Sequence, residues 1–176
     1  MKRKTYIGLA IAFIIATAAC SKQDRENTII NQEESIDSYI SSLRDVEVVH
    51  NNGSNRVILS RSSSAVVAEN GDSLYMRFAG YLFSNGPGAM FITNDTSIVE
   101  NKDFVEMLEK PYGIKLGSTA MVDGLARGLQ GVAEGEHCYI IFSAKYGFNN
   151  TEVAAIPKLS PLFYDIWIDK IIKNGE

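Results

Sequence analysis

Histidine, tryptophan, proline and positive charge are all scarce in this sequence of 176 residues. It has two histidines, one tryptophan, four prolines, and 17 lysines and arginines against 21 aspartates and glutamates, for a formal charge of −4. A mildly acidic chain argues against nucleic acid as a partner. His50 and His137 have no cysteine or second histidine at a ligand spacing, so the sequence predicts no metal site and no cofactor.

Familiar catalytic motifs are absent as well. Serines 62–64 lie in a low-complexity loop without the Gly-x-Ser-x-Gly pattern of a nucleophile elbow. Gly124, Gly128 and Gly131 fall inside an expected helix and follow no strand and turn of the dinucleotide-binding type. We interpret these glycines as packing positions rather than as a phosphate-binding loop.

The N-terminus has an apolar run, but it is short. Lys2, Arg3 and Lys4 precede apolar residues 7–15, and a spanning helix would need about 20 such residues. Small residues then lead to Cys20, a pattern that resembles the lipobox of bacterial lipoproteins. The resemblance implies a signal peptide over 1–19, lipidation of Cys20 and a membrane-tethered protein of the bacterial cell envelope, on a periplasmic or outer-membrane face. Thr17 departs from the usual leucine, so a plain secretory signal or an uncleaved anchor remains an alternative.

Lipidation of Cys20 would leave Cys138 as the single thiol, which excludes a disulfide framework. Cys138 lies in an apolar run that favours a buried structural thiol over a nucleophile.

Residues 20–32 are polar and have no apolar period, which predicts a flexible tether. Residues 33–70 are expected to form an N-terminal extension, with a helix over 33–46 and a hairpin turning at 51–53. Ile36, Tyr39, Ile40 and Leu43 form the apolar stripe of that helix.

Residues 71–176 are expected to form the main domain. Ser73 to Phe83 is the longest strand-like run in the first half of the chain, and Gly80 inside it predicts a bulge or a close approach to the backbone. Residues 110–135 follow as an apolar strand over 111–116 and a helix over 119–130. Strands over 136–143 and 159–172 complete an α+β fold, a half-barrel of five or six antiparallel strands around one central helix. Residues 94–109 are predicted to be an insert with one short helix.

Eight short blocks follow one another along the chain: Leu74–Gly80 (LYMRFAG), Met90–Phe91, Lys110–Tyr112 with Leu116–Gly117, Met121–Leu125 with Gly128–Leu129, Gly135–Glu136, Tyr146–Phe148, Ile156–Pro157 and Leu162–Asp165. In this order they resemble the FKBP-type peptidyl-prolyl cis-trans isomerase family. The resemblance covers about a hundred residues. Because it extends over eight separate blocks, it is more specific than any one motif.

The resemblance implies an apolar pocket for a prolyl ring. Its catalytic residues would be Phe78, Phe91, Tyr112, Val122, Leu125, Phe148 and Tyr164, with Met121 and Ile156 as further substrate-binding residues. The partners implied are prolyl segments of exported proteins.

Four departures weaken the case for catalysis. Phe78 and Phe148 lack hydroxyls that the family's tyrosines carry, and Leu125 replaces the tryptophan of the pocket floor. The family's aspartate after the phenylalanine is Ile92 here, and Asp95 would substitute only if its loop folded back. Two alternatives to an isomerase therefore stay open: a non-catalytic module that holds a peptide or partner protein, and a structural lipoprotein whose own side chains fill the groove.

Overall fold

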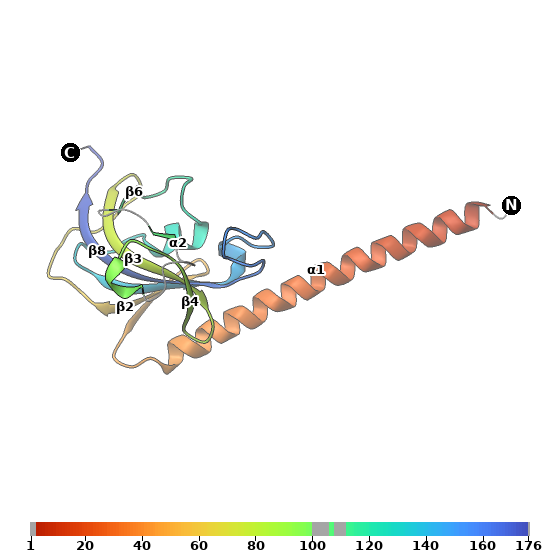
Figure 1. The fold of residues 1–176 in the computed structure, drawn as a ribbon, viewed down its shortest axis with the longest axis horizontal. Coiled ribbons are helices and arrows are strands. Elements are labelled where there is room, and N and C mark those ends of the chain that lie inside the picture. The colour runs from red at the N-terminus through yellow and green to blue at the C-terminus, as the bar shows by residue number, and fades with distance from the viewer. Residues whose placement is uncertain (1–2, 100–105, 108–111, 176) are drawn as a thin grey trace.

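The computed structural model describes residues 3–99, 106–107 and 112–175, and the side chains from residue 22 onward except those of residues 96, 106 and 107. One twisted sheet forms the body, and the long helix α1 (Arg3–Ser42) projects away from it (Figure 1). The strands are β1 (Glu47–Asn51), β2 (Ser54–Ser60), β3 (Ser73–Phe83), β4 (Pro87–Thr93), β5 (Glu106–Met107), β6 (Tyr112–Lys115), β7 (His137–Phe142) and β8 (Leu162–Ile172).

The strands follow the order β1-β2-β7-β8-β3-β4-β5, and β6 also pairs with β3. Every pairing is antiparallel except that between β4 and β5. The expected α+β class is therefore confirmed. The described sheet has eight strands, more than the five or six expected, because the β1–β2 hairpin pairs with β7 and joins the same sheet.

Strand β3 pairs with three other strands, β4, β6 and β8, and its bounds match the predicted run. It pairs with β8 from Ser73↔Ile172 to Leu82↔Leu162. Leu74, Met76 and Phe78 alternate with more exposed residues and are buried on one face. This period-two pattern aims them all at the same core.

Helix α2 (Asp123–Gly128) lies against the concave face of the sheet and is shorter than the helix predicted over 119–130. Val122 is extended, with ψ 145°, so the helix begins only at Asp123. Gly131 has φ 70° and follows the helix end. Glycine is a poor helix former, and its recurrence at 124, 128 and 131 keeps the helix short.

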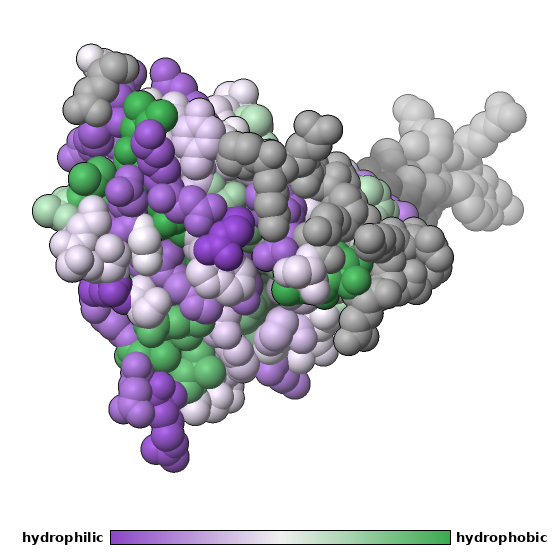
Figure 2. All heavy atoms as spheres, turned by 60° about the vertical axis from the view of Figure 1, so that its left-hand side comes forward, coloured by the Kyte–Doolittle hydropathy of each residue, from purple (hydrophilic) through white to green (hydrophobic). Residues whose placement is uncertain are grey.

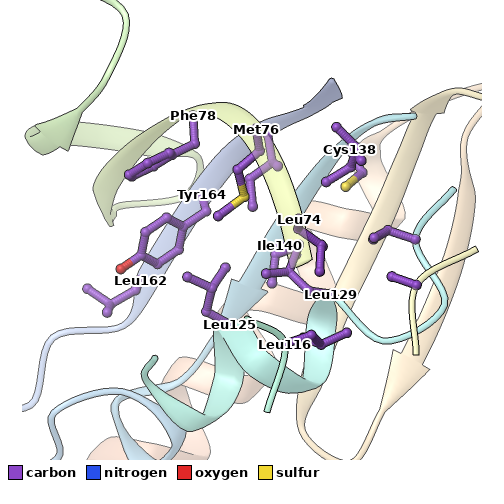
Figure 3. Close-up of a cluster of buried hydrophobic side chains, with 14 of the residues drawn as sticks. Leu74, Met76, Phe78, Leu116, Leu125, Leu129, Cys138, Ile140, Leu162 and Tyr164 are labelled. Atoms are coloured by element: carbon purple, nitrogen blue, oxygen red, sulfur yellow. The ribbon is translucent and has the colours of Figure 1, made fainter. Parts of the chain in front are cut away.

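Gly124 and Gly128 in α2 are packing positions, as expected, whereas a Cβ on Gly131, which follows the helix, would meet nothing within 4 Å. A Cβ on Gly124 would lie 2.3 Å from the ring of Phe142, and one on Gly128 would lie 2.3 Å from Ile140. Their absence lets α2 lie close to β7. The buried hydrophobic side chains form two clusters. One lies between the sheet and α2 and is shown in Figure 3, and the other lies between the opposite face of the sheet and α1.

Helix α1 corrects the prediction of a flexible tether over 20–32, because those residues are helical. The segment has no apolar stripe, so hydrophobic periodicity gave no signal. The helix is supported there by side-chain contacts one turn apart. Nε2 of Gln23 donates a hydrogen bond to Oδ1 of Asn27 (3.1 Å), and Lys22 forms an ion pair with Glu26 (3.9 Å).

The C-terminal part of α1 carries the predicted apolar stripe. Ile36 and Ile40 are buried against Phe163 and Ile141 on the convex face of the sheet. The helix ends at Ser42 rather than at residue 46. Within the described residues, no helix combines the length and hydropathy needed to cross a membrane.

The predicted helix around Phe104, Val105 and Leu108 lies outside the described residues. The described parts of that insert are the 3-10 turn η1 (Thr96–Ile98) and β5. On the face shown in Figure 2, hydrophilic residues separate the hydrophobic ones into small areas.

Candidate functional site: an apolar cavity between the sheet and α2

A cavity of about 650 Å³ opens between the concave face of the sheet, α2 and the segment that joins β7 to β8. Its lining side chains are aliphatic or aromatic, apart from two tyrosine hydroxyls and methionine sulfur. A volume of this size accommodates a small molecule or a few residues of a peptide.

All nine residues predicted from the sequence for a pocket line this one cavity. They are Phe78 on β3, Phe91 on β4, Tyr112 on β6, Met121 and Val122 before α2, Leu125 in α2, Phe148 and Ile156 in the β7–β8 segment, and Tyr164 on β8. Cys20, the predicted lipidation site, is part of α1.

Burial divides these residues into a floor and a rim. Phe78, Phe91, Leu125, Ile156 and Tyr164 are each at most 8% exposed and form the floor. The other four, Tyr112, Met121, Val122 and Phe148, are partly exposed and pack against that floor. The cavity is therefore a cleft with a buried base of largely apolar side chains.

The floor aromatics hold one another at defined angles. The rings of Phe91 and Tyr164 meet edge to face at 5.9 Å and 90°, and Phe78 lies 5.2 Å from Tyr112. Figure 3 shows Phe78, Tyr164 and Leu125 converging from β3, β8 and α2. Such pairs restrict ring orientation and give the cleft a fixed shape.

Gly80 makes this arrangement possible and confirms the expectation of a close approach. A Cβ at Gly80 would lie 2.7 Å from Ile92 and 2.9 Å from the ring of Phe91. The predicted bulge is present too, since the β3–β4 register shifts between Gly80 and Tyr81.

Sequence reasoning missed eight lining residues. Met76, Ile114 and Ile166 each lie two positions from a predicted residue on the same strand, so strand alternation would have identified them. Ile92 stands where the family has its aspartate, so the resemblance would have identified it. Ala120, Val153, Ala154 and Ala155 carried no comparable signal. The last three belong to a turn closed by two backbone hydrogen bonds between Val153 and Ile156.

Tyr112 and Tyr164 carry the only side-chain hydroxyls among the lining residues. Tyr164 is 6% exposed, and its hydroxyl makes no hydrogen bond with the described part of the chain. Burial raises the pKa of Tyr164, and the nearby Tyr112 raises it further. Tyr164 is therefore a neutral hydroxyl at the cavity floor.

The polar side chains that follow Ile92 do not line the cavity. The Asp95 carboxylate does not line the cavity; it accepts hydrogen bonds from the backbone and hydroxyl of Ser97 (3.1 and 2.6 Å) and caps η1. Asn94, which the sequence did not single out, is fully buried instead. Its side chain donates to the Met76 carbonyl and accepts from the Phe78 amide, both at 2.8 Å. Asn94 thus fixes the backbone of β3 beneath the cavity.

The fold and the cleft define a class of protein: an open antiparallel sheet with a short helix across its concave face and an apolar cavity between them. Residues 65–169, more than half of the chain, match the FKBP-type peptidyl-prolyl cis-trans isomerase family. The chain belongs to that family.

Two examples illustrate the similarity of this chain to solved structures. FkpA from Escherichia coli matches over 99% of this chain and 75% of its own, with a TM-score of 0.61 and 15% identity. The three FKBP domains of wheat FKBP73 match over 73% of this chain, with a TM-score of 0.58 and 17% identity. This chain spans half the length of the wheat structure. At these identities the likeness is one of fold.

Proposed function

We propose that this protein is an envelope-tethered peptidyl-prolyl isomerase or folding factor that acts on prolyl segments of exported proteins. The observation that carries the proposal is the apolar cavity between Phe78, Leu125 and Tyr164. A prolyl ring is apolar and has no amide N–H, so a dry cleft can receive it without leaving a buried donor unpaired.

The chemistry asked of such a site is modest. Rotation about an X–Pro bond has a barrier of about 20 kcal/mol and relaxes in tens of seconds. The amide loses resonance as it twists, and its twisted form is less polar. A water-poor cleft that fits the twisted amide lowers the barrier without a nucleophile, metal or proton shuttle.

Tyr164 is the side chain best placed to add a directed contact. Its hydroxyl lies at the floor of the cavity and has no partner among the described residues, so it can donate to a carbonyl oxygen of a bound peptide. A neutral hydrogen bond of this kind contributes about 0.5 to 1.5 kcal/mol. That corresponds to roughly a two- to tenfold effect on rate or affinity.

The cellular location is part of the proposal. Its support is the cationic and apolar N-terminal segment followed by small residues and Cys20. Two or more acyl chains on Cys20 would anchor the protein firmly, since each buried CH₂ contributes about 0.8 kcal/mol.

A protease-coupled assay on prolyl tetrapeptides tests the catalytic claim. We expect the purified chain to accelerate cis-to-trans isomerisation above the uncatalysed rate at micromolar concentration. A Leu125→Asp variant, which places a charge on the cavity floor, should lose the acceleration. An unaccelerated rate with the unaltered protein would refute catalysis.

A second candidate is a non-catalytic module that holds prolyl peptides in the same cleft. The observation that favours it is the apolar character of Ile92 and Phe148, both of which line the cavity. This reading predicts peptide binding that is lost in Tyr112→Ala and Tyr164→Ala, without any isomerase rate. Fluorescence titration with a labelled prolyl peptide separates the two candidates.

A purely structural lipoprotein is a poorer match to these observations. It requires a groove filled by the protein's own side chains, for example those of the insert at 94–109. The part of the chain that the structure describes leaves about 650 Å³ open.

A further inference from the structure

We propose that Gln32 of α1 is a positioning residue that holds the β7–β8 segment in the shape the cavity needs. The proposal rests on the proposed function of the cleft. It assigns to the N-terminal helix a role in substrate binding, in addition to linking the domain to its anchor.

One amide group joins the two ends of that segment. The backbone N–H of Ala144 donates to Oε1 of Gln32 (3.0 Å), and Nε2 of Gln32 donates to the carbonyl of Leu159 (2.7 Å). Ala144 is the second residue after β7, and Leu159 lies three residues before β8 begins at Leu162. Gln32 thus closes a loop whose ends are fifteen positions apart.

This loop supplies much of the cavity rim. Phe148, Val153, Ala154, Ala155 and Ile156 all line the cavity, and all lie between the two contacts of Gln32. Figure 1 shows the segment between β7 and β8 beside α1. A change in the contacts between α1 and the loop would therefore alter the positions of residues that line the cavity.

The loop needs external support because its backbone is strained. Asn149, Ala154 and Leu159 have φ values of 51°, 48° and 55°, in the left-handed region that non-glycine residues rarely adopt. Leu159, whose carbonyl accepts from Gln32, also donates its N–H to the Asn149 carbonyl at 2.7 Å. Conformations of this kind persist only where their surroundings determine them.

A second contact secures the same end of the loop. The hydroxyl of Ser143 donates to Oε1 of Glu33 at 3.1 Å, next to the Gln32 contact. Farther along α1, Ile36 is buried against the convex face of the sheet. Helix α1 is therefore held against the sheet close to Gln32, so it can act as a rigid support for the loop.

The test compares Gln32→Met, Gln32→Glu and the control Gln23→Met in the full chain. Methionine keeps the length of the side chain and removes both hydrogen bonds. Glutamate keeps the acceptor for Ala144 and removes the donor to Leu159. Gln23 lies on the exposed part of the same helix, so Gln23→Met makes the same chemical change away from the loop.

We expect Gln32→Met to raise KM for a prolyl peptide roughly three- to tenfold, with kcat changing less, and Gln32→Glu to fall between it and the unaltered protein. The Gln23→Met variant should match the unaltered protein. Amide hydrogen exchange at Asn149, Thr151 and Ile156 should accelerate in Gln32→Met, while the midpoint of global unfolding stays nearly the same.

Unchanged KM in Gln32→Met would overturn the proposal, whether or not exchange accelerates, and so would unchanged exchange in the loop. If the unaltered protein neither isomerises nor binds prolyl peptides, the proposed function itself has failed. In that case loop exchange alone decides whether Gln32 holds the segment.

Discussion

Gly80 on β3 lies directly opposite Tyr164 on β8 in the antiparallel register. The missing side chain at Gly80 is what admits the ring of Phe91, which meets Tyr164 edge to face. A single glycine thus determines how the floor aromatics of the cavity pack.

Gly80→Ala should therefore disturb the cavity and the fold together. The new Cβ would meet Ile92 and Phe91 at less than 3.0 Å, and overpacking of this kind costs about 1 to 3 kcal/mol. Urea denaturation followed by tryptophan fluorescence measures the loss. Retention of both full stability and peptide affinity would show that Phe91 can move freely.

Tyr164→Phe should reduce kcat/KM for a prolyl peptide roughly two- to tenfold and leave the free energy of unfolding unchanged or higher. The buried hydroxyl has no partner among the described residues, so its removal breaks no internal bond. Tyr81→Phe is the matched control, because Tyr81 lies on β3 and packs on the face of the sheet opposite the cavity. A variant with full activity would remove Tyr164 as a donor to substrate.

Asp72→Asn should weaken the dependence of stability on acid pH. Hydrogen bonds from the Lys173 ammonium (2.8 Å) and from the backbone amides of Glu69 and Asn174 lower the Asp72 pKa to about 2. Because this pKa is below its unfolded value, the carboxylate stabilises the fold above about pH 4, and that contribution is lost as pH falls towards 2.

Urea unfolding midpoints at several pH values between 2 and 5 measure this effect. The asparagine variant should show a smaller decline than the unaltered protein over that range. Asp24→Asn, on the exposed part of α1, controls for the loss of a charge alone. Equal declines in all three proteins would contradict the assignment.

Cys20→Ser should release the protein from membranes into the soluble fraction, because serine cannot form the thioether to a lipid. Fractionation of cells followed by immunoblotting measures the distribution. Cys138→Ser is not a suitable control, because Cys138 is fully buried in the core and a serine there would disturb the fold. Ser21→Ala, which keeps Cys20, is the better comparison, and membrane association in Cys20→Ser would refute lipidation.

Much of the cavity was predictable because its residues lie on regular elements. Phe78, Leu125 and Tyr164 belong to blocks whose order resembles the FKBP family, and strand alternation extends from them to Met76 and Ile166. The turn at 153–156 was not predictable in this way. Its alanines show no apolar periodicity. They line the cavity only because the fold brings this turn next to strands that are distant in the sequence.

Helix α1 shows the opposite error. Residues 20–32 lack an apolar stripe, so the sequence favoured a tether, yet the structure continues the helix through them. Polar pairs one turn apart support a helix without leaving a hydrophobic pattern. The contact of Gln32 with the loop could not be predicted for a related reason, since a single polar residue produces no periodic pattern in the sequence.

The sequence by itself determined the α+β class, the long strand over 73–83 and the apolar character of the nine predicted pocket residues. These follow from local alternation and from residue type, which act over a few neighbouring positions. Only the tertiary structure decided that Gly80 admits Phe91, that Asn94 takes the buried polar role beneath the cavity, and that Gln32 closes the rim. Each of these depends on atoms brought together from distant parts of the chain, where packing and hydrogen bonding rather than local preference determine the outcome.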